Sequence, residues 1–144
     1  MPGNMMLARR IKDAVIPATT GVMASYPTGT TASIEVDSSG SAGTAGSYTQ
    51  ILPINTVTSD FRITSVVISG FESATRYTLE LATGNAGSEV SIGSFAVSAG
   101  ATADAFVVPV SMKDIPANSR VSIRSAVLAG TNQHCDVAIN YVTV

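Results

Sequence analysis

The residues of this chain best suited to nucleophilic catalysis are its single histidine, His134, and its single cysteine, Cys135. They are adjacent in a predicted strand, where neighbouring side chains point to opposite faces. A nucleophile and its base must lie within hydrogen-bonding distance, so these two residues cannot form a catalytic pair. Cys135 is in phase with Val137 and Ile139, which predicts a place in the core, whereas His134 is expected to face solvent where the strand begins.

No residue pattern in this sequence indicates metal binding, sugar hydrolysis or phosphate binding. A structural zinc site takes about four cysteine or histidine ligands, and one residue of each type is too few. Asp37 begins the segment Asp-Ser-Ser-Gly-Ser, which lacks the later acids of a calcium-binding loop. Glycoside hydrolysis needs two carboxylates about 5–9.5 Å apart, and the acidic residues fall singly in separate turns and strands. With no G-x-S-x-G or G-x-G-x-x-G motif either, we expect no enzyme activity, no metal, no cofactor and no small-molecule substrate.

Basic residues are concentrated at the start of the chain. Residues 1–13 contain Arg9, Arg10 and Lys12 but only one acid, Asp13, so their net charge is +2, against −2 for the whole chain. A basic end on an acidic body indicates contact with an acidic partner, so these three cations are candidate partner-binding residues. A nucleic-acid-binding protein usually carries a broad basic stripe, which this sequence lacks.

The composition predicts one domain with part of its surface covered. A chain of 144 residues has room for a single domain. Only 12% of the residues are charged, about half of the roughly 25% that is usual for soluble domains. Such a shortage of charge favours burial of some surface in an oligomer or a lattice. The longest apolar run covers residues 105–110, far short of the roughly 20 residues that cross a membrane, and no signal peptide is evident, so we expect a protein made in a cytoplasm.

The first 47 residues lack a sustained pattern. Residues 1–31 are predicted to form an arm, either extended or with one short helix at residues 5–15 that Pro17 would end. An isolated helix of this length is marginal, which favours the extended form. A short strand is predicted at residues 32–36. The segment at residues 38–47, SSGSAGTAGS, has the composition of a flexible loop.

Residues 48–144 consist of short apolar strands separated by turns, which predicts an antiparallel β-sandwich. In the run at residues 61–68, one face is apolar only at Val66 and Ile68. The alternation in the run at residues 90–97 slips at Gly93, which predicts a β-bulge. Pro109 predicts either an edge strand or a bulge. The predicted strands cover residues 61–68, 76–81, 90–97, 105–110, 120–127 and 135–141. We therefore expect an all-β fold with a jelly-roll-like sandwich at residues 32–144 and an extended N-terminal arm.

Two segments resemble a known family. Residues 77–90 are Tyr-Thr-Leu-Glu-Leu-Ala-Thr-Gly-Asn-Ala-Gly-Ser-Glu-Val, and residues 115–124 are Ile-Pro-Ala-Asn-Ser-Arg-Val-Ser-Ile-Arg. In this order, followed by a terminal strand that ends at Tyr141, they resemble small β-sandwich virion proteins of tailed bacteriophages. The resemblance covers about residues 60–144. Such proteins serve as capsid cement (decoration) proteins, head fibres or tail-tip modules, often as trimers.

The resemblance implies a structural protein located in the virion. In the first hypothesis the chain is a homotrimeric capsid cement protein whose arm binds the major capsid protein and stabilises the outer shell. In the second it is a receptor-binding or fibre module of the phage tail or head. Arg120 and Arg124 lie on the predicted wet face of a strand, so they join the three N-terminal cations as candidate partner-binding residues.

Overall fold

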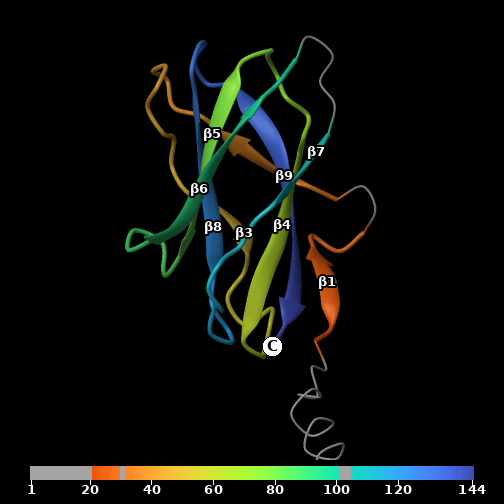
Figure 1. Ribbon diagram of the computed structural model, residues 1–144. Helices are drawn as coiled ribbons and strands as arrows, with labels where there is room; N and C mark the ends of the chain where they lie inside the picture. The colour runs from red at the N-terminus through yellow and green to blue at the C-terminus, as the bar shows by residue number, and fades with distance from the viewer. Residues whose placement is uncertain (1–20, 30–31, 101–104) are drawn as a thin grey trace, which may run out of the picture.

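The computed structural model describes residues 21–29, 32–100 and 105–144 of the chain (Figure 1). These residues form nine β-strands and no helix, so no described helix could cross a membrane. The strands are β1 (Met23–Tyr26), β2 (Ile34–Asp37), β3 (Thr49–Leu52), β4 (Phe61–Ser69), β5 (Arg76–Thr83), β6 (Val90–Ser98), β7 (Phe106–Pro109), β8 (Val121–Val127) and β9 (His134–Thr143).

The strands form two antiparallel sheets that pack as a sandwich (Figure 1). One sheet has the order β1-β9-β4-β7, with β2 also paired to β9, and we call it sheet A. The other has the order β3-β8-β5-β6, and we call it sheet B. From β2 onward the chain changes sheet at every connection except the β5–β6 hairpin. Sheet A thus has five strands and sheet B has four. Without β1, the remaining eight strands lie four to a sheet in the arrangement of a jelly roll, so the predicted all-β sandwich is confirmed.

Alternate residues of both sheets fill the space between them. Phe61, Tyr77, Leu79, Ile123 and Ile139 are fully buried there. Aromatic rings interlock at the core, where Phe61 meets Tyr141 edge-on and Phe71 packs against both Tyr77 and Phe106. Cys135 and Val137 are also fully buried, which confirms the predicted inward face of the last strand.

Two β-bulges decide which residues of the long strands face the core. In β4 the pairing with β9 shifts between Ile63 and Ser65, so Phe61 and Ile63 are buried before the bulge and Val66 and Ile68 after it. The uneven apolar pattern of this run is the sign of that bulge, which we did not predict. In β6 the pairing with β5 shifts beside Gly93, as predicted. The edge position predicted from Pro109 is confirmed, because β7 ends the order of sheet A.

The predicted N-terminal arm contributes a strand to the sandwich. Strand β1 lies within residues 1–31, and it pairs with β9 from Met23 opposite Val142 to Tyr26 opposite Ile139. Tyr26 packs against the core. The described part of the predicted arm therefore pairs with sheet A through β1. The candidate helix at residues 5–15 lies outside the described residues.

The loop at residues 38–47 is joined to the sandwich by backbone hydrogen bonds. Its amide groups at Ser38, Gly43 and Gly46 donate hydrogen bonds of 2.8, 2.7 and 2.9 Å to backbone carbonyls of Gln133, Val127 and Ser125. A Cβ atom at Gly46 would lie 2.5 Å from the carbonyl oxygen of Asp37, so this close approach requires glycine. Small residues here permit tight packing as well as flexibility.

Candidate functional site

Two ion pairs within the chain lie on the outer face of sheet B. The Arg124 guanidinium lies 2.6 Å from the Glu80 carboxylate, and its centre lies 4.5 Å from the centroid of the Tyr48 ring. A hollow of about 610 Å³ opens beside Tyr48 and Arg124. Arg124, a predicted partner-binding residue, therefore already has an acidic and an aromatic partner within the chain.

Arg120 joins the two segments that carry the family resemblance. Its Nη1 donates to the Glu89 carboxylate and to the Gly84 carbonyl, both at 3.1 Å, and its Nε donates to the Gln50 side-chain oxygen at 3.1 Å. Glu89 also accepts a hydrogen bond of 2.9 Å from the Gly87 amide. The exposed fractions of the Arg120 and Glu89 side chains are 12% and 9%. This arginine therefore holds the β5–β6 turn against β8, a role within the fold that we did not predict.

Of the five predicted partner-binding residues, the structure describes Arg120 and Arg124. Arg120 and Arg124 lie on β8 or just before it, and each forms an ion pair inside the chain. The other three, Arg9, Arg10 and Lys12, lie outside the described residues. The spacing of Arg120 and Arg124 places them on one face, but only the strand register shows that Glu89 and Glu80 face them there.

Acid is expected to weaken the outer face of sheet B. A hydrogen bond from the Arg124 guanidinium lowers the pKa of Glu80 below its ordinary value of 4.5. The pKa of Glu89 is also lowered, by a hydrogen bond from the backbone amide of Glu89 and by Arg120. A carboxylate with a lowered folded-state pKa contributes stability above its unfolded pKa, and this contribution is lost as pH falls through the folded value. We expect Glu80→Gln to reduce the free energy of unfolding by about 1 kcal/mol at pH 7, as for partly exposed ion pairs.

The check is chemical denaturation of the wild type and of Glu80→Gln between pH 7 and pH 3. The two stabilities should converge as the pH falls below about 4.5, since protonation removes the same interaction in the wild type. Parallel curves over this range would show that the ion pair contributes nothing measurable.

The outer face of sheet A has a different character. Outward-facing residues that lie directly opposite one another in neighbouring strands form rows across this sheet. The pairing of β9 with β1 and β4, and of β4 with β7, sets these rows, and the central ones carry no charged residue. An outward-facing antiparallel sheet is normally polar and solvated. The residues of these rows are Ser25, Ser65, Val67, Val107, Pro109, Ala138 and Asn140. We call this set the neutral face.

A hollow of about 360 Å³ lies on the neutral face. Ten residues line it and none of them is charged, including Ser25 of β1, Val67 of β4 and Ala138 and Asn140 of β9. At one end of sheet A lie acidic residues of β2 and β9, and near the other lies Arg62, paired with Asp114 at 2.7 Å. An uncharged centre between charged margins is typical of surfaces that bind other proteins.

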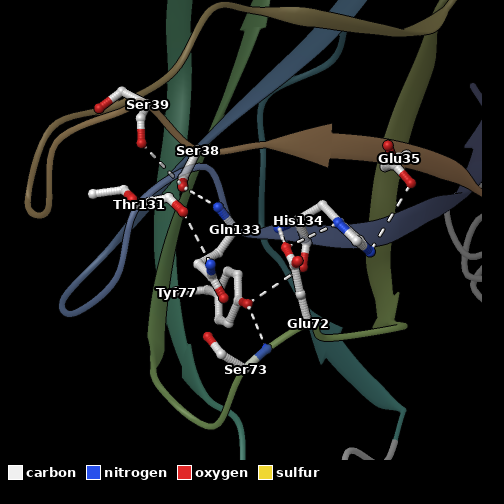
Figure 2. A network of polar contacts seen from close by, with 9 residues as sticks. All are labelled: Glu35, Ser38, Ser39, Glu72, Ser73, Tyr77, Thr131, Gln133 and His134. Atoms are coloured by element: carbon white, nitrogen blue, oxygen red, sulfur yellow. Dashed lines mark hydrogen bonds and ion pairs between the residues drawn. The ribbon is translucent and has the colours of Figure 1, made fainter.

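The acidic end of this face surrounds His134, as Figure 2 shows in part. The Glu72 carboxylate lies 3.1 Å from His134 Nδ1 and also accepts the His134 backbone N–H at 3.2 Å. On the other side of the ring, Nε2 lies 4.0 Å from Glu35. Asp37 is directly opposite His134 in the β2–β9 pairing, and potential metal-ligand atoms of Glu35, Asp37 and His134 lie within 4.8 Å of one another.

Buried groups fix the position of His134 from below. The Tyr77 hydroxyl donates to the His134 carbonyl at 3.3 Å and accepts the Ser73 amide at 3.4 Å (Figure 2).

Burial, with smaller effects from Asp136 and Asp37, raises the pKa of Cys135 to about 12, so its thiol stays protonated at neutral pH. Cys135 is therefore a core residue and a poor nucleophile. The side chain of His134 is 35% exposed, partly covered by its carboxylate neighbours.

No protein-family model, curated protein or solved structure matches this chain.

Proposed function

We propose that this chain is a non-enzymatic structural protein of a bacteriophage virion. In this proposal it is a capsid cement protein that assembles as a homotrimer and stabilises the outer shell. The observation that carries the proposal is the neutral face of sheet A, with its uncharged hollow of about 360 Å³. A face without charge loses less hydration free energy than a charged face when another protein covers it, which favours association.

The contrast between the two sheets supports an assembly role. The pairs Arg124–Glu80 and Arg120–Glu89 lie on the outer face of sheet B, whereas the charged residues of sheet A lie toward its two ends and leave the neutral face between them uncharged. Jelly rolls are common among viral capsid domains, which supports a structural role in a virion. The same fold also serves many other functions. We assign the neutral face to contacts between copies of the chain.

The N-terminal segment is the proposed grip on the shell. It leads into β1 at the edge of sheet A, where the Val22 amide donates to the Thr143 hydroxyl at 3.0 Å. The basic residues Arg9, Arg10 and Lys12 precede this point and would contact acidic surface on the major capsid protein. Three such arms on one trimer would add their affinities, because binding of the first raises the effective concentration of the others.

The test uses the full chain and shells of the phage that encodes it. Light scattering after size-exclusion chromatography should show a trimer, and sedimentation with the shells should show saturable binding that raises their resistance to heat or dilution. A monomer that stays in the supernatant would overturn the cement proposal. Binding to host cells in place of shells would instead favour the receptor-binding or fibre alternative.

A further inference from the structure

Four carboxylates gather at the acidic end of sheet A, those of Glu35, Asp37, Glu72 and Asp136. Glu35 is directly opposite Asp136 in the β2–β9 pairing, and Asp37 is opposite His134. Among the described residues, none of these acids forms an ion pair with lysine or arginine. Like charges directly opposite each other destabilise a sheet, so this arrangement favours a bound cation.

The imidazole of His134 is oriented for a metal ion. Glu72 lies 3.1 Å from Nδ1, which favours the proton on that nitrogen and leaves the lone pair of Nε2 free. A carboxylate on the second ring nitrogen is the usual support of a metal-binding histidine. Nε2 faces away from Glu72 and toward Glu35, at 4.0 Å (Figure 2).

The ligand atoms lie almost close enough together for coordination. Bonds of about 2.0–2.2 Å to nitrogen and oxygen place tetrahedral ligand atoms roughly 3.4 Å apart. The three ligand atoms here lie within 4.8 Å of one another, and the Glu35 side chain is 61% exposed. Side-chain rotation of the exposed Glu35 and Asp37 can close the remaining gap without moving the backbone.

We propose that Glu35, Asp37 and His134 form a binding site for a divalent transition-metal ion, with Glu72 as a positioning residue. Zn²⁺ fits this set best, because imidazole nitrogen and carboxylate oxygen are both zinc ligands, whereas Mg²⁺ and Ca²⁺ prefer oxygen alone. Three protein ligands leave a fourth position for water. The bound ion would tie β2 to β9 and neutralise the acidic end of sheet A, and this inference does not depend on the proposed virion function.

The sequence could not show this site. Glu35 and Asp37 are two residues apart and so share one face of a strand, but a strand with two acids is usually a solvated one. His134 lies far along the chain, and it faces these acids only because β2 pairs with β9 in one particular register. Excluding a four-ligand structural site from the counts of cysteine and histidine does not exclude a site built with carboxylates.

The experiment is calorimetric titration of the metal-free full chain with Zn²⁺ alone. We expect one saturable site per chain and a higher melting temperature in the presence of Zn²⁺. Asp37→Asn and His134→Ala should abolish binding, and Glu72→Gln should weaken it by about 10–100-fold, as outer-shell substitutions typically do. Asp114→Asn, at an exposed acid away from the cluster, is the matched control and should bind as the wild type does.

A spectroscopic readout separates coordination from loose attraction. Co²⁺ in place of Zn²⁺ should give visible absorption bands of a four-coordinate site, and these should disappear in His134→Ala. If His134→Ala does not fold, Asp37→Asn, at an exposed position, decides the matter. Absence of a saturable site, or a site that persists unchanged in Asp37→Asn, would overturn the proposal and leave Glu72 and His134 as a hydrogen-bonded pair alone.

Discussion

If copies of the chain associate through the neutral face as proposed, replacing Ala138 by lysine is expected to weaken that association at least tenfold while the domain stays folded. Ala138 lies in the middle of the neutral face, beside Val67 of β4, and it lines the uncharged hollow. A lysine there would place an ammonium group, without an acidic partner, at the centre of the proposed contact. Covering an unpaired charge costs several kcal/mol, and about 1.4 kcal/mol already corresponds to a factor of ten.

Sedimentation velocity over a range of protein concentrations measures the effect. Thr78→Lys is the matched control, because Thr78 lies on the outer face of sheet B between strands β6 and β8. Both variants should melt close to the wild type, since both positions point away from the core. Equal loss of association in both variants, or none in Ala138→Lys, would show that the neutral face is not the contact between copies.

Local patterns predicted those parts of the fold that depend on one strand at a time. The buried positions of Cys135, Val137 and Ile139 follow from alternation alone. A glycine at a slip in the pattern indicated the bulge in β6, and Pro109 indicated an edge strand, because both residues alter backbone hydrogen bonding directly. No residue at the bulge of β4 gives such a sign, since the extra residue there is an ordinary strand former, Thr64.

Features that need two distant segments could not be predicted. Arg120 meets Glu89, and Asp37 meets His134, only through registers that core packing sets across the whole sandwich. The hydrogen bonds of the loop at residues 38–47 could not be predicted for the same reason, because their acceptors lie in β8 and in the turn before β9. Among the described residues, Arg120 and Arg124 looked free to bind a partner but form ion pairs within the chain.

The ion pair of Arg120 also bears on the family resemblance. The resemblance rests on two segments, residues 77–90, which contain Gly84 and Glu89, and residues 115–124, which contain Arg120. Arg120 donates hydrogen bonds to both Gly84 and Glu89. The two segments thus form one structural unit that anchors a turn to β8. A unit of this kind can be selected for stability in any protein of this architecture, so the virion proposal has to rest on the neutral face and its test.

Two truncations are expected to separate folding from shell binding. Deletion of residues 1–31 removes β1, which pairs with β9 and packs Tyr26 against the core. Tyr26 is partly buried, so loss of its packing alone should lower the free energy of unfolding by less than the roughly 1.5–3 kcal/mol of a fully buried side chain. The uncovered edge of β9 would also promote aggregation. Deletion of residues 1–20 spares β1, so this shorter protein should unfold with nearly the stability of the full chain.

The shorter truncation then reports on the arm itself. If Arg9, Arg10 and Lys12 grip the shell, the protein without residues 1–20 should remain a trimer but lose at least tenfold in affinity for shells, because three tethered contacts are removed at once. Glutamine at these three positions in the full chain is the matched variant, and it should reproduce most of the loss and weaken the salt dependence of binding. A protein without residues 1–20 that still decorates shells fully would place the grip on the sandwich, since a folded trimer would then bind without its arm.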